Sequence, residues 1–257
     1  MIEFRKIKSI LAMSVVAFGA FSTTVMARDL RIATEGTYAP WSFVDEQGKL
    51  TGWDVDIANA LCEQMKVKCE IIAQEWDGII PGLNAKKYDM IVASMSVNEK
   101  RKQQVAFTKK YKNSTSQFIA AKGSFPDTSP AALAGKRIGV QRGSSQDAYL
   151  TDKYKDSDIV RYDKTSDPEM DLVAGRVDLI LANRVTELSG FLTRPEAANL
   201  ALVGQEYSGG PLGDGNAIAV RKDDTELLQE VNDAIDALIA NGTYDKITAK
   251  YFKFKLM

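Results

Sequence analysis

Two serines and an arginine follow a short apolar run in the sequence. Residues 90–93 read Met-Ile-Val-Ala, and Ser94, Ser96 and Arg101 come soon after them. A buried strand that ends in hydroxyl groups is typical of the carboxyl edge of an open α/β sheet, where such sheets bind ligands. Ser96 and Glu99 match the S-x-x-E capping box, so we expect a helix with Ser96 as its N-cap.

The chemistry that this arrangement offers is anion binding. A helix N-terminus presents backbone N–H groups without partners and the positive end of the helix dipole. The planar guanidinium of Arg101 can bind a carboxylate through two parallel hydrogen bonds. The alternative is an ordinary capped helix with a solvated arginine, and this segment by itself does not decide between the two.

The composition excludes several classes of function. The chain has 257 residues, with 33 Lys and Arg, 34 Asp and Glu, and no His. Without His, catalysis by Ser–His or Cys–His pairs and His-based metal sites are excluded. We expect neither a metal nor a cofactor. The near-neutral charge argues against nucleic acid or an anionic membrane as a partner of the whole surface.

The first 27 residues have the three parts of a secretion signal. Arg5, Lys6 and Lys8 supply the charge, residues 10–19 form the apolar region, and a small-residue cleavage site ends at about Ala27. The apolar region is shorter than the roughly 20 residues of a membrane-spanning helix. Losing three basic residues and one acidic residue lowers the net charge from −1 to −3. We expect an exported, soluble protein.

Cys62 and Cys69 are the only cysteines of the chain. In an oxidising compartment, an isolated pair so close in sequence is most simply a disulfide. Closing so short a loop stabilises the fold by roughly 2–3 kcal/mol in the chain-entropy model. Two buried free thiols are the alternative, whereas the spacing does not fit a CxxC redox or zinc motif.

Strand-like and helix-like segments alternate along the mature chain, which predicts parallel sheets covered by helices on both faces. The expected strands cover residues 30–34, 69–73, 88–93, 117–121, 137–140, 159–162, 178–182 and 216–220, with a hairpin over 43–53. The expected helices cover residues 54–65, 78–85, 167–174 and 225–241, with another beginning at 147. Two such regions without a flexible tether predict that the chain crosses between them more than once and forms a hinge.

A set of motifs occurs along the mature chain in a specific order and spacing. They are Thr34-Glu35-Gly36-Thr37-Tyr38-Ala39-Pro40-Trp41, Gly52-Trp53-Asp54-Val55-Asp56, Trp76-Asp77-Gly78-Ile79-Ile80-Pro81, Ser94-Met95-Ser96 with Arg101, Gly139-Val140-Gln141-Arg142-Gly143-Ser144, and Asn241-Gly242-Thr243-Tyr244. With these motifs the chain resembles the periplasmic solute-binding proteins of polar amino-acid ABC transporters, family 3. It is most similar to the lysine/arginine/ornithine- and histidine-binding group and its opine-binding relatives.

The resemblance implies the two-lobed α/β fold of type II periplasmic binding proteins. Each lobe would hold a mixed, mostly parallel sheet flanked by helices, and a two-segment hinge would join the lobes. Lobe 1 would comprise residues 28–115 and 213–257, and lobe 2 residues 116–212. The family works as a periplasmic receptor that closes over a small amino acid or amino-acid derivative and delivers it to an inner-membrane ABC permease. We expect a monomer that is no enzyme and binds no nucleic acid.

The resemblance also implies where the ligand binds. The matching positions are Glu35, Tyr38, Trp76, Ala93, Ser94, Ser96, Arg101, Ser145 and Asn183. Arg101 would clamp the ligand α-carboxylate, helped by donors at Ser94 and at Ser145, which opens a helix. Ser96 and the backbone near Ala93 and Ser94 would bind the α-ammonium, and Asn183 would complete that pocket.

The ligand side chain would lie between two aromatic rings. Tyr38 and Trp76 would sandwich it, because an aromatic face suits a flat guanidinium or a methylene stem. Glu35 would face the cationic end. The alternatives are two core aromatics and a solvated loop acid. Gln146 is a weaker addition to the site, because its side chain can point away.

Two departures from the family pattern bear on the ligand. Most amino-acid binders of this group carry Asp at position 183, whereas Asn183 supplies no charge and suits a ligand with a substituted α-nitrogen. The opine-binding relatives also have Asn there, but this chain lacks their long insertion between Phe125 and Arg137. We therefore expect a cationic amino acid of the arginine, lysine, ornithine or histidine type. An octopine- or nopaline-type opine is the alternative, and a periplasmic dehydratase using Glu35 is a remote one.

Overall fold

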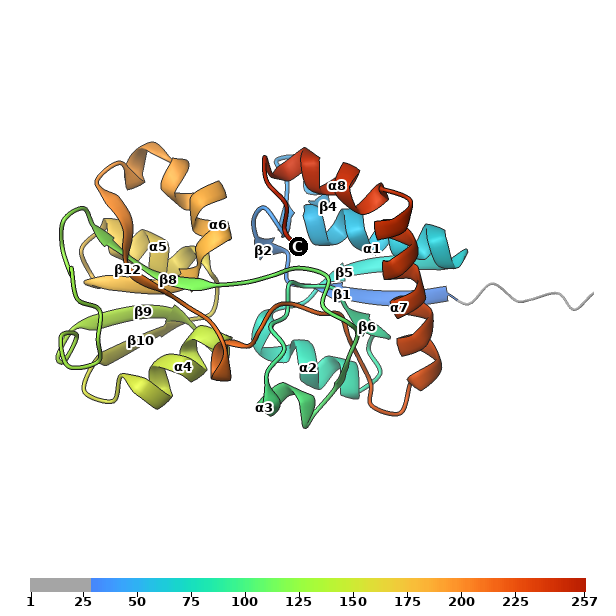
Figure 1. Cartoon of the computed structure of the whole chain (residues 1–257), viewed down its shortest axis with the longest axis horizontal. Coiled ribbons are helices and arrows are strands. Elements are labelled where there is room, and N and C mark those ends of the chain that lie inside the picture. The colour runs from blue at the N-terminus through green and yellow to red at the C-terminus, as the bar shows by residue number, and fades with distance from the viewer. Residues whose placement is uncertain (1–28) are drawn as a thin grey trace, which may run out of the picture.

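The computed structural model describes residues 29–257, so the predicted signal peptide lies outside the described residues. The chain folds into two α/β lobes that lie next to each other (Figure 1). Each lobe is built on a five-stranded sheet, with strand orders β5-β1-β6-β13-β7 and β10-β9-β11-β8-β12. The two lobes expected from the sequence are therefore present.

The first lobe takes its strands from both ends of the chain. Its sheet contains β1 (Asp29–Thr34), β5 (Lys68–Ala73), β6 (Met90–Ile91), β7 (Ala106–Phe107) and β13 (Ala219–Val220). A small second sheet contains β2 (Thr37–Tyr38), β3 (Ser42–Val44) and β4 (Leu50–Thr51). The helices are α1 (Trp53–Met65), α2 (Trp76–Asn84), α3 (Glu99–Lys102), α7 (Thr225–Ala240) and α8 (Thr243–Tyr251).

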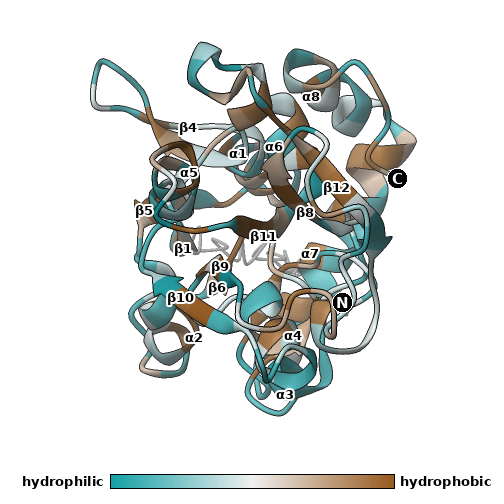
Figure 2. Cartoon of the chain, turned by 90° about the vertical axis from the view of Figure 1, so that its left-hand side faces the viewer, coloured by the Kyte–Doolittle hydropathy of each residue, from teal (hydrophilic) through white to brown (hydrophobic). Residues whose placement is uncertain are grey.

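The second lobe is formed by one continuous part of the chain. Its strands are β8 (Ser116–Ala121), β9 (Arg137–Gln141), β10 (Asp158–Tyr162), β11 (Leu179–Asn183) and β12 (Leu200–Tyr207). Its α-helices are α4 (Ser145–Lys153), α5 (Ser166–Val173) and α6 (Arg184–Ser189). Short 3-10 helices cover Phe191–Thr193, Pro195–Ala197 and Gly210–Leu212. Figure 2 shows the hydrophobic strands β8 and β11 near the centre of this lobe, with hydrophilic segments toward its edges.

Both sheets are mixed. In the first lobe β1 is parallel to β5 and β6, whereas β13 is antiparallel to β6 and β7. In the second lobe β9 is parallel to β10 and β11, whereas β8 is antiparallel to β11 and β12. The antiparallel strands β8 and β13 each follow a crossing between the lobes. A strand that enters a sheet from the other lobe is not joined to its neighbours by the crossover helix of a βαβ unit, so it can run antiparallel to them. The strand β12 is absent from the sequence-based expectations.

The chain crosses between the lobes twice. One crossing joins β7 to β8, and the other joins β12 to β13; the two segments run close together in the middle of the molecule (Figure 1). Isolated bridges connect Asn216 on the second crossing to Lys112 on the first and to Ser96. The crossing segments are therefore coupled to each other and to the loop that carries Ser96.

The predicted elements agree with the structure apart from their ends. The helix α1 begins at Trp53, one residue before the expected start, and α4 begins at Ser145, two residues before it. Cys62 and Cys69 form a disulfide, as expected. Within the described part of the chain no helix is long and apolar enough to cross a membrane, and no group of three or more His, Cys, Asp or Glu side chains is arranged to hold a metal ion.

Candidate functional site

A pocket lies between the two lobes, at the carboxyl ends of the central strands. Both lobes and both crossings contribute to its wall. The residues that line it are Glu35, Tyr38, Trp76, Ala93, Ser94, Ser96, Arg101, Ser114, Gln141, Ser144, Ser145, Gln146, Thr165, Pro168, Ile180, Leu181, Ala182, Asn183, Glu187 and Asn216. The structure thus brings all nine residues predicted from the sequence to one pocket, together with Gln146.

Arg101 contributes a buried cation to this pocket. Its side chain donates a hydrogen bond to the Ser96 carbonyl at 3.0 Å and lies over the Trp76 ring, 5.1 Å from the ring centre. Burial lowers the pKa of Arg101 to about 10, which still leaves the guanidinium protonated at neutral pH. No acidic side chain within residues 29–257 forms an ion pair with it. The pocket therefore holds a positive charge without its counter-ion.

The helix that carries Arg101 does not begin as predicted. The N-cap of α3 is Asn98, whose side chain accepts a hydrogen bond from the Arg101 N–H at 3.0 Å, so the assignment of Ser96 as N-cap was wrong. Ser96 instead pairs with Asn216 in an isolated bridge. Its hydroxyl contacts the Ser145 hydroxyl of the other lobe at 3.3 Å. The tertiary pairing with Asn216 overrides the local capping signal, and Asn98 is an equally good capping residue.

Ser94 is held in place by a buried polar cluster behind the pocket. Its backbone adopts the left-handed conformation, with φ of 49°. The Ser94 hydroxyl donates to Asp54 at 2.7 Å, and its N–H donates to the Tyr111 hydroxyl at 3.0 Å. Tyr111 in turn donates to Asp54 at 2.7 Å. Both donors of Ser94 are thus engaged inside the protein, whereas the sequence analysis predicted that they bind the ligand carboxylate.

A buried lysine provides the charge that Asp54 needs. The Lys112 ammonium lies over the Trp41 ring, 3.6 Å from the ring centre, and its side chain is 1% exposed. Burial raises the pKa of Asp54 to about 6 and lowers that of Lys112 to about 7, and the attraction between the two charges opposes both shifts. Lys112 lies on a crossing segment, so this pair joins the hinge to the wall of the pocket.

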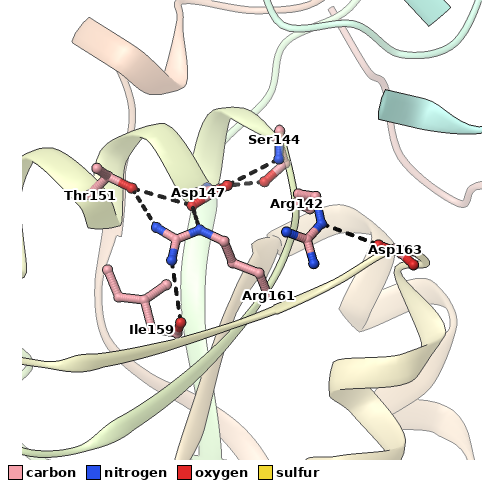
Figure 3. A network of polar contacts seen from close by, with 8 residues as sticks. Arg142, Ser144, Asp147, Thr151, Ile159, Arg161 and Asp163 are labelled. Carbon is pink, nitrogen blue, oxygen red and sulfur yellow. Dashed lines mark hydrogen bonds and ion pairs between the residues drawn. The ribbon is translucent and has the colours of Figure 1, made fainter. Parts of the chain in front are cut away.

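The N-terminus of α4, in the second lobe, lies at the pocket. Ser144 is the N-cap and accepts a hydrogen bond from the Asp147 N–H at 3.0 Å, while Asp147 accepts one from the Gly143 N–H. Arg161 on β10 donates to Asp147 at 2.8 Å and so fixes the first turn of the helix (Figure 3). The first N–H groups of α4, including that of Ser145, have no intrahelical acceptors and are available to an anion.

Glu35 supplies a negative charge to the same pocket. It is 4% exposed, and its carboxylate accepts a hydrogen bond from the Gln141 amide of the other lobe. Burial raises the pKa of Glu35 to about 7, although the hydrogen bonds from Gln141 and Thr37 oppose the shift. An ionised Glu35 in the closed pocket therefore calls for a cationic partner.

The two predicted aromatic residues both lie at the pocket, and each contacts the far lobe. The Trp76 indole donates to the Gly143 carbonyl at 3.2 Å. The Tyr38 hydroxyl is hydrogen-bonded to the Thr186 hydroxyl on α6, with 3.0 Å between the two oxygens. Both side chains are partly buried. Together with the Glu35–Gln141 contact, these hydrogen bonds hold the lobes in a closed arrangement.

Asn183 ends β11 and caps the next helix. Its side-chain oxygen accepts hydrogen bonds from the N–H and the hydroxyl of Thr186, both at 3.1 Å. Its amide nitrogen donates to the Ser114 hydroxyl at 2.7 Å. The side chain is therefore neutral and already engaged within the protein. One turn further along α6 lies Glu187, a second buried acid of the pocket wall that sequence reasoning did not single out.

Sequence reasoning missed two kinds of lining residue. Gln141 and Glu187 had a usable signal, because Gln141 ends β9 at the same edge of its sheet and Glu187 follows Asn183 by four residues. Ser114 and Asn216 had none. They lie on the crossing segments and reach the pocket only through the packing of the two lobes.

A closed pocket between two mixed α/β lobes is the arrangement found in the two-lobed binding proteins of type II. The sequence model of the bacterial extracellular solute-binding proteins, family 3, matches residues 30–254. The chain belongs to this family. The expected membership is thus confirmed.

Individual relatives agree with this assignment. An L-arginine-binding protein of Pseudomonas aeruginosa is 42% identical over 95% of this chain and 94% of its own. The lysine/arginine/ornithine-binding periplasmic protein of Escherichia coli is 39% identical, covering 97% of this chain and 98% of its own length. An octopine-binding periplasmic protein of Rhizobium meliloti is 36% identical, covering 96% and 98%. These relatives are binding proteins, as expected for a chain that is no enzyme.

A solved structure shows the same fold. An ancestral arginine-binding protein bound to arginine superposes with a TM-score of 0.80 and 36% identity. The match covers 87% of this chain and 98% of the other. The prediction of a two-lobed periplasmic-binding-protein fold is therefore confirmed.

Proposed function

We propose that this protein is the periplasmic receptor of an ABC importer and captures a cationic amino acid of the arginine, lysine, ornithine or histidine type. The observation that carries the proposal is the pair of opposite charges in one closed pocket. Among residues 29–257, neither the buried cation Arg101 nor the buried acid Glu35 forms an ion pair. A ligand with a carboxylate at one end and a cation at the other neutralises both.

The carboxylate end binds at the junction of the two lobes. Arg101 clamps the carboxylate, and the N-terminus of α4 at Ser145 adds backbone donors from the second lobe. Ser94 shapes this end through its fixed backbone, since its own donors serve Asp54 and Tyr111.

The remaining predicted residues bind the rest of the ligand. The Ser96 hydroxyl and the carbonyl groups of Ala93 and Ser94 accept hydrogen bonds from the α-ammonium, next to Asn183. The side chain of the ligand lies between the two partly buried aromatic rings and ends at Glu35. The aromatic rings belong to Tyr38 and Trp76.

The protein selects its ligand when the hinge closes. Residues 28–115 with 213–257 form one moving lobe, and residues 116–212 form the other. A ligand that fits satisfies groups of both lobes and so favours the closed arrangement. The receptor acts as a monomer, is cleaved after about Ala27 on export, binds no nucleic acid and hands its ligand to a membrane permease. Its relatives named as periplasmic binding proteins support this location.

An opine is the second candidate ligand. The neutral Asn183 favours it, because the α-ammonium of an opine has fewer N–H donors than a primary ammonium and lies next to a second carboxylate of the opine itself. The relative named as octopine-binding supports the same alternative.

A thermal-shift screen of the ligand-stripped mature protein tests the proposal. Arginine, lysine, ornithine, histidine, octopine and nopaline are compared, with glutamate as the control of wrong charge. A ligand at about 100 times its dissociation constant adds about 2.7 kcal/mol and raises the melting temperature by several degrees. A shift with a basic amino acid supports the proposal, a shift with opines alone assigns the second ligand, and no shift with any of them overturns both.

A further inference from the structure

One acid of the pocket wall has a buried oxygen without a partner among the described residues. Glu187 is 3% exposed and lines the pocket, and its Oε2 atom is buried without a hydrogen bond. A buried carboxylate oxygen that lacks a donor is costly, so its presence calls for a group that completes it.

The neighbouring protein groups do not neutralise Glu187. Burial raises the pKa of Glu187 well above its ordinary value, and the like charge of Glu169 raises it further. The attraction of Arg194 lowers the pKa of Glu187, but the Arg194 guanidinium is itself bound to Glu169 at 3.3 Å. Tyr38 is the other titratable group that faces it. No group of the described residues completes this carboxylate, so a cation that enters the pocket can do so.

The position of Glu187 matches the charge that Asn183 lacks. Asn183 is the N-cap of α6, and Glu187 lies four residues later, so both lie on the same side of this short helix. The oxygen of Asn183 already accepts two hydrogen bonds from Thr186, and its amide nitrogen is occupied by Ser114. Asn183 offers a ligand ammonium neither charge nor a free acceptor atom in this arrangement.

We infer that Glu187 is the specificity-determining residue for the α-nitrogen of the ligand: its carboxylate pairs with the α-ammonium in place of a charge at position 183. The inference rests on the proposed function and names the residue that reads this part of the ligand. It also gives the pocket a preference against an opine, because the carbon substituent on the α-nitrogen of an opine carries a second carboxylate and that group would meet Glu187.

The test compares two ligands that differ only at this nitrogen. Calorimetry measures the affinity of the mature protein for arginine and for 5-guanidinopentanoate, which has the same carboxylate and guanidinium but no α-amino group. In Glu187→Gln, the dissociation constant for arginine rises about 10- to 100-fold, whereas that for 5-guanidinopentanoate changes less than about threefold. A purely structural role would weaken both ligands to the same extent.

Two further variants complete the design. Glu206→Gln removes an exposed acid of the same lobe that lies outside the pocket wall, and it leaves the ratio of the two affinities within about threefold of the wild type. In Asn183→Asp combined with Glu187→Gln, a charge returns one turn away and arginine affinity recovers at least in part, because Asp also caps α6.

The outcomes separate the inference from the proposed function. Equal arginine affinity in Glu187→Gln and the wild type, or an equal loss for both ligands, overturns the role of Glu187. Absence of binding of every basic amino acid to the wild-type protein overturns the proposed function instead. If Glu187→Gln does not fold, the inference is tested with the double variant and with the ratio of the two wild-type affinities. A wild-type protein that binds arginine and 5-guanidinopentanoate equally tightly contradicts the inference.

Discussion

The Gln141 amide of the second lobe donates a hydrogen bond to the Glu35 carboxylate of the first. This contact spans the pocket and forms only when the lobes are close together. If the lobes part, as the proposed function requires, Glu35 would enter water, and closure would remove that water again. Ligand charge, closure and the ionisation of Glu35 are therefore linked.

Affinity for a ligand with a neutral side chain should fall as the pH rises. Burial in the closed pocket raises the pKa of Glu35 from 4.5 to about 7. Closing over glutamine therefore takes up a proton between these two pH values, and its affinity decreases by up to about tenfold per pH unit as the pH rises through this window. Arginine brings its own cation to Glu35, so the affinity for arginine relative to glutamine rises with pH in this window. Calorimetry at pH 5 to 8 measures both.

The control for this experiment is Glu35→Gln. The variant has no acid to titrate at this position, so the affinity for glutamine should become independent of pH, and the affinity for arginine should fall. Parallel pH profiles of the two ligands in the wild-type protein would contradict the link.

Replacing Arg101 with Ala should nearly abolish binding. The ligand carboxylate would then be buried without its counter-charge, which costs about 2–5 kcal/mol, or roughly 30- to several thousand-fold in affinity. Arg142→Ala is the matched control, because Arg142 is exposed and pairs with Asp163 outside the pocket wall. Unchanged affinity of Arg101→Ala by calorimetry would sink the assigned carboxylate site.

Tyr111→Phe should destabilise the protein. The lost hydroxyl donates to Asp54 and accepts from the Ser94 N–H, so its removal leaves two buried groups short of a partner. Each costs about 1–3 kcal/mol, which urea unfolding measures. In Tyr251→Phe the lost hydroxyl contacts the more exposed Asp56, so a smaller loss is expected. A Tyr111→Phe variant as stable as Tyr251→Phe would show that the buried cluster is not needed to fix Ser94.

Reducing the disulfide should lower stability without changing the affinity for the ligand. Cys62 and Cys69 close a short loop from α1 to β5, worth roughly 2–3 kcal/mol. Neither residue lines the pocket. The double variant Cys62→Ser with Cys69→Ser should therefore melt at a lower temperature and bind arginine as the wild type does. A weaker affinity at a temperature where the variant is folded would argue for coupling between this loop and the hinge.

The local chemistry of the site could be predicted from the sequence. Arg101 follows a buried strand, Ser145 opens a helix, and Glu35 leaves β1, so each lies at the carboxyl edge of a sheet by rules that act over a few residues. The same local rules predicted the alternation of strands and helices. The disulfide followed from two isolated cysteines in an exported chain.

Tertiary structure alone decided which partners these residues have. The capping box at Ser96 failed because Asn216, 120 residues away, pairs with it across the lobe. The two donors of Ser94 bind Asp54 and Tyr111, which are also distant in the sequence. The antiparallel strand β12 begins with the apolar run of residues 200–203, but so short a run does not say which strand it pairs with, and its pairing with β8 joins distant parts of the chain.

The sequence by itself determined the alternation of strands and helices, the disulfide, and Arg101 and Glu35 as charged residues of the pocket, because strand periodicity and motif spacing are local properties. Only the tertiary structure decided that Glu35 meets Gln141, that Asn183 is engaged in capping α6, and that Glu187 is buried with a free oxygen. These contacts depend on how the two lobes and the two crossing segments pack against one another. No short stretch of sequence determines that packing.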